Sequence, residues 1–174
     1  MKIYLKKIIM IFLLVVLGIL SVVRIMYVNA KQHVKEVYTY QVGETFEYNN
    51  FQLKVEEVNI YNVDDMKRMY KEIPQEMLPE NEMLIKVEVK NIGNEEQVFN
   101  VIPFTLQCGI ERGSSLDPYV YPYVNPELNG NVVLGKEESQ TVTLAYPVDE
   151  SALERKGEIK LILSLYPIKY QIIL

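Results

Sequence analysis

The recurrence of an apolar side chain at every second position of residues 83–90 constrains the fold more than any other feature of the sequence. In this segment, MLIKVEVK, positions 83, 85, 87 and 89 are apolar, and positions 86, 88 and 90 carry charge. Successive side chains of a β-strand point to opposite faces of the sheet, so the segment has one apolar face and one charged face. The pattern predicts a half-buried antiparallel strand.

Similar alternation recurs over most of the chain after residue 40. Apolar positions alternate on both sides of the turn pair Asn49-Asn50, which predicts a β-hairpin followed by a bulge at Glu56-Glu57. After a turn at residues 91–94, we expect residues 98–108 to form the return strand of residues 83–90, with Pro103 at a bulge or an edge. Later strands are expected at residues 138–146 and 159–174, the last either continuous or broken at Pro167.

Two segments interrupt the strand pattern. Residues 62–82 are predicted to be an insertion with a short helix, capped by Asp64 and ended by Pro74. Residues 109–130 hold three Gly and three Pro, and we expect a long connection with a short extended piece. About seven short strands without a long amphipathic helix predict an all-β, antiparallel sandwich over residues 41–174.

The N-terminal segment is apolar over 16 residues, at 8–23, and three lysines precede this run. Lysines ahead of an apolar run hold the N-terminus in the cytoplasm and send the chain after the run across the membrane. Two outcomes fit this segment. In the first, which we favour, residues 8–28 form an uncleaved transmembrane anchor with Arg24 at its end; in the second, cleavage after Ala30 secretes the chain. The expected organisation is a cytoplasmic tip with anchor or signal peptide at 1–30, a stalk at 31–40, and the sandwich.

Charge and composition argue against several classes of function. After residue 30 the chain has 14 Lys and Arg against 23 Asp and Glu, a net charge of −9, so nucleic-acid binding is not expected. Cys108 is the only cysteine and His33, in the stalk, the only histidine, so neither a disulfide nor a nucleophile–base pair is predicted. We therefore expect no enzyme and no cofactor. Calcium held by Asp64-Asp65 with Glu127 or Asp117 is an alternative, although no calcium-loop spacing is present and a helix cap explains Asp64.

Several motifs together resemble a known family. They are VGETFEYNNFQLKVEEV, ENEMLIKVEVKNIGNEEQVF, FTLQ and VVLGKEESQTVTLAYPVDESA. Over residues 42–174 they resemble the extracytoplasmic immunoglobulin-like, or telokin-like, domains of unknown function of Gram-positive bacteria. The resemblance implies an immunoglobulin-like β-sandwich behind a membrane anchor or signal peptide, and it brings no catalytic residues.

A contact surface is predicted on the two irregular segments, because tyrosine and methionine side chains are common in protein interfaces. Its candidate residues are Tyr119, Tyr121, Tyr123, Met66, Met69 and Tyr70. The competing interpretation is that the tyrosines cover the sandwich edge and the methionines form a lid packed on it. The function expected is a binding or accessory module of the cell envelope with a protein partner. The alternatives are a structural or immunity protein that shields a membrane complex and, less favoured, a metal-dependent hydrolase.

Overall fold

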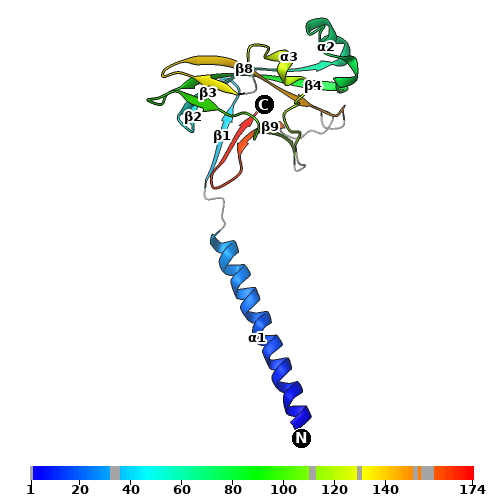
Figure 1. Cartoon of the computed structure of the whole chain (residues 1–174), viewed down its shortest axis with the longest axis vertical. Coiled ribbons are helices and arrows are strands. Elements are labelled where there is room, and N and C mark those ends of the chain that lie inside the picture. The colour runs from blue at the N-terminus through cyan, green and yellow to red at the C-terminus, as the bar shows by residue number, and fades with distance from the viewer. Residues whose placement is uncertain (1, 32–35, 110–112, 129–130, 151–152, 154–158) are drawn as a thin grey trace. The chain divides into compact units, whose positions relative to one another are not determined.

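The computed structural model describes residues 2–31, 36–109, 113–128, 131–150, 153 and 159–174. The chain divides into two units, residues 1–35 and residues 36–174 (Figure 1). The first unit is helix α1 (Lys2–Lys31), and the second contains all strands of the described residues. The sandwich therefore begins before residue 41, because β1 (Val37–Gln41) occupies the end of the segment predicted as a stalk.

Helix α1 is long and apolar enough to cross a membrane. Its segment Met10–Ala30 has 21 residues and a mean hydropathy of 2.6. At a rise of 1.5 Å per residue this segment is about 32 Å long, which matches the hydrocarbon core of a bilayer, about 30 Å thick. A signal sequence near an N-terminus has the same properties, so α1 is a signal or an anchor.

The second unit is a β-sandwich of two four-stranded sheets with a separate two-stranded ribbon. Sheet A has the strand order β1, β10 (Lys169–Ile173), β9 (Ile159–Ser164) and β6 (Thr105–Cys108). Sheet B has the order β2 (Thr45–Tyr48), β3 (Phe51–Asn62), β4 (Asn81–Asn91) and β8 (Ser139–Pro147). The ribbon pairs β5 (Gln97–Phe99) with β7 (Val132–Leu134).

Sheet B confirms the hairpin and the bulge. Tyr48 pairs with Phe51, and both turn residues have positive φ, 50° at Asn49 and 64° at Asn50. Asparagine tolerates this conformation better than most residues, and two positive φ angles are what a two-residue hairpin turn requires. The register between β3 and β4 shifts between Val55 and Glu57, as the doubled glutamate predicted.

The predicted return strand at residues 98–108 is wrong. The segment forms two strands, β5 and β6, which pair with β7 and β9, while β4 pairs with β3 and β8. Val101 and Phe104 between them are buried in the core, and the Phe104 N–H donates to the Val101 carbonyl at 3.0 Å. This turn takes the chain out of one strand direction, so a single continuous strand cannot form.

The strand number and the antiparallel pairing also differ from the prediction. The described residues form ten strands instead of about seven, in part because residues 98–108 divide and β1 was assigned to the stalk. The chain end breaks into β9 and β10 around Pro167, which confirms one of the two alternatives expected there. All pairs are antiparallel except β1 with β10, which is parallel. The sandwich itself is confirmed: side chains from both sheets share one core, among them Leu53, Ile85, Leu106 and Leu161.

Candidate functional site

A cap covers part of the outer face of sheet B, and it is built from the two irregular segments. We define the cap as residues 63–78 and 117–125. It contains α2 (Val63–Met69), the 3-10 turn η1 (Gln75–Met77) and α3 (Tyr121–Val124). Its apolar cluster joins side chains of the cap to β4 and β8: Met66, Ile73, Leu84, Val120 and Ala145. Figure 1 shows α2 and α3 near one another on the same side of the sandwich.

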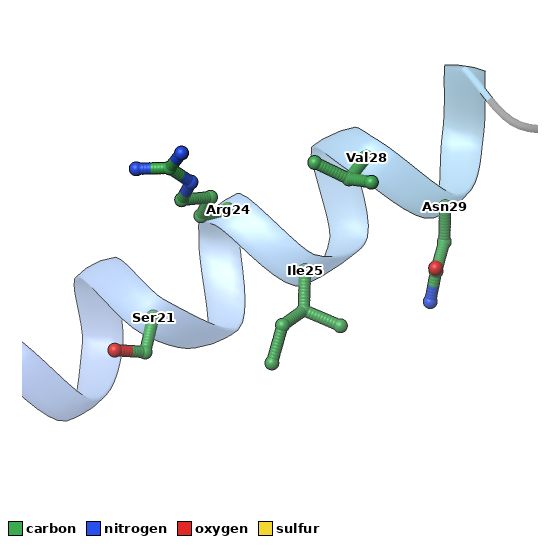
Figure 2. A pocket seen from close by; sticks show the side chains of 5 residues that line it. All are labelled: Ser21, Arg24, Ile25, Val28 and Asn29. Carbon is green, nitrogen blue, oxygen red and sulfur yellow. The ribbon is translucent and has the colours of Figure 1, made fainter.

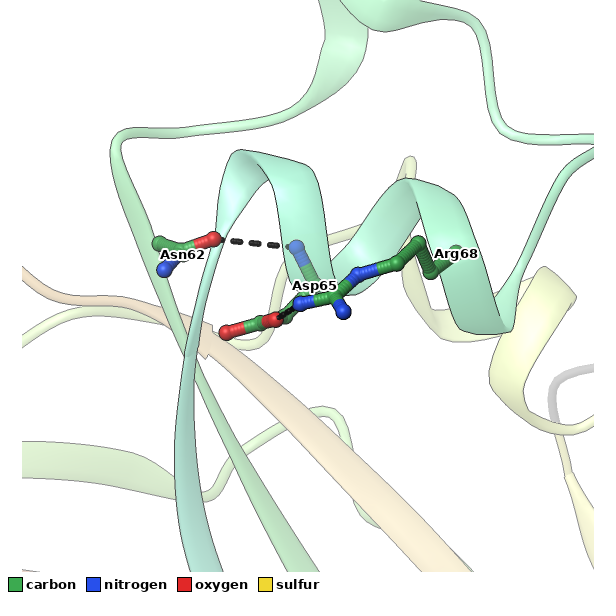
Figure 3. A network of polar contacts seen from close by, with 3 residues as sticks. All are labelled: Asn62, Asp65 and Arg68. Atoms are coloured by element: carbon green, nitrogen blue, oxygen red, sulfur yellow. Dashed lines mark hydrogen bonds and ion pairs between the residues drawn. The ribbon is translucent and has the colours of Figure 1, made fainter.

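Helix α2 begins earlier than a cap at Asp64 would place it. The Asn62 Oδ1 accepts the Asp65 N–H at 2.9 Å, so Asn62 is the N-cap, and Asp65 forms an ion pair with Arg68 (Figure 3). The helix ends at Met69, before Pro74. Met66 on its inner side is buried, whereas Met69 is 46% exposed, so the helix packs on the sheet through one face only.

The tyrosine-rich segment is helical at residues 121–124 and not extended. The Asp117 side chain starts it, because its Oδ1 accepts the N–H groups of Tyr119 at 2.7 Å and Val120 at 3.0 Å. The helical turn changes which side chains share a face. Tyr121 is buried and Tyr119 is 60% exposed, so these two tyrosines do not lie on one exposed face.

Hydrogen bonds from the Asn125 side chain connect this segment to the open edge of sheet B. Its Nδ2 donates to the Thr143 carbonyl at 2.7 Å, and its Oδ1 accepts the Thr143 N–H at 2.8 Å. The side-chain amide thus pairs with the β8 backbone as a neighbouring strand would. An edge strand with occupied backbone groups cannot recruit another chain there, so the cap also protects the sheet edge.

Beneath the cap lies a buried carboxyl group. Glu82 of β4 is fully buried, and neither of its carboxyl oxygens has a hydrogen-bond partner among the described residues. Burial, with a smaller contribution from Asp117, raises the pKa of Glu82 to about 8. The buried Tyr121 and Tyr146 hydroxyls also lack partners within the described part of the chain, and burial raises the pKa of both.

Two cavities open on the cap, and α3 contributes to both. The first, of about 280 Å³, is lined by Met69, Tyr70, Lys71, Glu72 and Tyr123. The second, of about 450 Å³, is lined by Ile102, Ser115, Leu116, Pro118, Tyr121 and Pro122. The second cavity lies in the size range of small-ligand sites and has a mainly apolar wall.

The structure gathers the six predicted contact residues in one region but does not expose all of them. Met69 and Tyr119 are exposed, and Tyr70 and Tyr123 are half-buried around the first cavity. Met66 and Tyr121 are buried, so they support the cap and cannot themselves form a surface. Sequence reasoning missed Pro118 and Pro122 of the second cavity, although two prolines beside tyrosines were a usable signal.

The other residues considered in the sequence, the acidic candidates for calcium binding, Cys108 and His33, do not form a site among the described residues. The described residues contain no group of three or more His, Cys, Asp or Glu side chains placed to hold a metal ion, and Asp117 serves as a turn cap. Cys108 is half-buried in β6 and packs against the core. His33 lies outside the described residues.

A hollow on α1 is not a candidate site. It is lined by Ser21, Arg24, Ile25, Val28 and Asn29, which all belong to this one helix (Figure 2). A single helix cannot enclose a ligand. Its polar side chains lie near the end of the apolar segment of α1. An arginine at this position can reach the polar region of a bilayer.

A comparison with protein families identifies the second unit. The model of a domain of unknown function, DUF5028, matches residues 37–170. The chain belongs to the DUF5028 family. Its DUF5028 domain thus begins at β1 and ends within β10, in agreement with the sheet. No curated protein has significant similarity to the chain.

Several solved structures are similar to the chain at low sequence identity, and the first of them shares its fold. The yjhA protein from Bacillus subtilis is 15% identical, covers 78% of this chain and 99% of its own, and has a TM-score of 0.55. A conserved hypothetical protein from Bacillus anthracis is 15% identical, with coverages of 70% and 87% and a TM-score of 0.49. An uncharacterised β-sandwich protein from Clostridium difficile is 13% identical, with coverages of 80% and 97% and a TM-score of 0.46.

Proposed function

We propose that the protein is a membrane-anchored, extracytoplasmic binding module of the cell envelope, without catalytic activity, and that the cap binds its protein partner. The observation that carries the proposal is the convergence of the two irregular segments, which are about 40 residues apart in sequence, over one face of sheet B. Loops and short helices on a rigid sandwich are the common location of binding residues.

The side chains around the cap support protein binding. Tyr119 and Met69 are exposed, and the two cavities on the cap are lined in part by tyrosine, proline and leucine side chains. Tyrosine offers large, rigid contact area with a polar end, and methionine adapts to irregular surfaces. The apolar wall of the second cavity fits an aliphatic or aromatic side chain of a partner.

The anchoring half of the proposal is supported by α1. Lysines at positions 2, 6 and 7 precede its apolar segment, and a charge bias of this kind keeps the N-terminus in the cytoplasm. The DUF5028 domain then lies outside the membrane. Arg24 and Tyr27 favour an anchor over cleavage after Ala30, since both residue types are common at membrane interfaces.

We also infer that the sandwich is immunoglobulin-like, of the telokin-like kind. In such folds one sheet carries strands C, F and G and the other A, B, E and D. The order β6-β9-β10 fits C-F-G, and the order β3-β4-β8 fits A-B-E. An experimental structure of the domain tests this inference, and a strand order without β4 between β3 and β8 would contradict it.

Photo-crosslinking tests the binding surface. The photoreactive residue benzoylphenylalanine replaces Met69 or Tyr119 in the full-length chain, expressed in intact Gram-positive cells. Val133 of β7, which is 50% exposed and outside the cap, is the matched control position. We expect positions 69 and 119 to give the same adduct and position 133 to give none. Adducts of equal yield at all three positions, or none at the cap, would contradict the proposal.

A further inference from the structure

The turn between β9 and β10 carries two adjacent exposed side chains that the binding surface does not use. Leu165 is 61% exposed and Tyr166 is 67% exposed, while Leu163 just before them is buried in the core. The Ser164 Oγ donates to the Ile168 carbonyl at 2.8 Å and closes the turn. The hairpin therefore holds a leucine and a tyrosine away from the sandwich instead of packing them on it.

This turn lies at the end of sheet A where the chain enters the domain. β1 runs parallel to β10 with Val37 opposite Lys169, and the Lys169 N–H donates to the Glu36 carbonyl at 3.1 Å. Residues 165–167 precede Lys169, so they project beyond Glu36 in the direction opposite to β1. Within the second unit, Figure 1 shows this turn apart from the cap, which contains α3.

The tether from α1 to this end of the domain is short. Lys31 is the last residue of α1 and Glu36 the first residue of the second unit, so five Cα steps join them. Fully extended, five residues span at most about 18 Å. If α1 crosses the bilayer, the N-terminal end of the domain is confined near the lipid headgroups, and a weak contact there has a high effective concentration.

We propose that the β9–β10 turn docks on the lipid surface, with Leu165 and Tyr166 inserted at the interface of the bilayer that holds α1. The inference rests on the membrane anchoring proposed above. Tyrosine is enriched at this interface because its ring lies in the apolar boundary while its hydroxyl stays hydrated. Val37, 53% exposed beside the turn, adds apolar area. The contact is apolar, so zwitterionic lipids suffice.

The test uses tryptophan fluorescence, because the chain contains no tryptophan. Full-length chains with Tyr166→Trp or, as a matched control, Tyr119→Trp are reconstituted into phosphatidylcholine vesicles with or without brominated acyl chains. Both tyrosines are exposed to a similar degree, 67% and 60%. We expect at least twofold quenching by brominated lipid and a blue-shifted emission for Tyr166→Trp, and neither effect for Tyr119→Trp.

Flotation of the same samples separates the two ways in which the inference fails. If the chains do not float with the vesicles, the anchoring proposal fails and this inference falls with it. If they float and brominated lipid quenches neither tryptophan, the anchor stands and the lipid contact of the turn is wrong. Quenching of both tryptophans to the same extent would also overturn the inference, because it would mean a non-specific contact of the domain with lipid. Quenching of Tyr166→Trp alone, unchanged in 0.5 M salt taken as roughly three times physiological strength, supports it.

Discussion

Replacement of Glu82 by glutamine is expected to remove a large pH dependence from the stability of the DUF5028 domain. Glu82 is fully buried, its carboxyl oxygens have no partner among the described residues, and its pKa rises from 4.5 to about 8. Lys86, two positions along the same face of β4, pairs with the exposed Glu57 at 2.6 Å. The ionised form of Glu82 is therefore unfavourable in the folded domain.

The sign and size of the effect come from proton linkage. The unfolded chain loses this proton near pH 4.5 and the folded chain near pH 8, so the folded state binds more protons between these values. Stability from this group is complete below pH 4.5, decreases as pH rises through 8, and then levels off. Each tenfold change in proton affinity is worth about 1.4 kcal/mol, so the loss between about pH 5 and about pH 9 is roughly 4 kcal/mol. That is a large part of the about 5–15 kcal/mol typical of a domain.

The assay is urea denaturation at several pH values, followed by the near-ultraviolet circular dichroism of the tyrosines, with the full-length chain in detergent micelles. The free energy of unfolding of Glu82→Gln minus that of wild type should increase by roughly 4 kcal/mol from about pH 5 to about pH 9. Glu57→Gln is the control. Lys86 lowers the pKa of Glu57, so that carboxylate stabilises the domain above its unfolded pKa and loses the effect only as pH falls. A difference between Glu82→Gln and wild type that does not change with pH would mean that the folded domain does not raise the pKa of Glu82.

Four substitutions test the cap, one of them as a control at an exposed position. Met66→Ala should lower the free energy of unfolding by about 2–5 kcal/mol, because it leaves a cavity under α2, whereas Met69→Ala at an exposed position should cost well under about 1 kcal/mol; urea denaturation measures both. Asn62→Ala should lower the free energy of unfolding by about 0.5–2 kcal/mol, because it removes the N-cap of α2. A variant as stable as wild type would contradict the N-cap role of Asn62. Asn125→Ala should cost about 1–3 kcal/mol and speed amide exchange at Thr143, which loses its acceptor; unchanged exchange would contradict the edge pairing.

Local patterns were sufficient for the strands of sheet B. The hairpin at Asn49-Asn50, the bulge after Val55 and the half-buried strand β4 can each be predicted from residues close in sequence, because turn chemistry and period-two alternation are local. The break of residues 98–108 into β5 and β6 is not local. It depends on the pairing of β5 with β7 and of β6 with β9, which come later in the chain, and on the burial of Val101 and Phe104 in the shared core.

The candidate site was predicted in outline only. The two irregular segments could be recognised by their Gly, Pro and Tyr content, and both contribute to the cap. The sequence could not show which of their side chains face outward, since one helical turn at α3 exposes Tyr119 and buries Tyr121. The burial of Glu82 could not be predicted, because residue 82 was assigned to the insertion and lies in β4, where the cap covers the outer face of the strand.

Protease accessibility tests whether an uncleaved α1 holds the DUF5028 domain on the outside of the cell membrane, as we propose. Protoplasts of cells expressing the chain with a C-terminal tag are fractionated and blotted before and after external protease treatment. We expect a full-length band in the membrane fraction, whose tag is lost on treatment while cytoplasmic proteins stay intact. A band shortened by residues 1–30 in the medium, or a membrane band whose tag resists external protease, would contradict it.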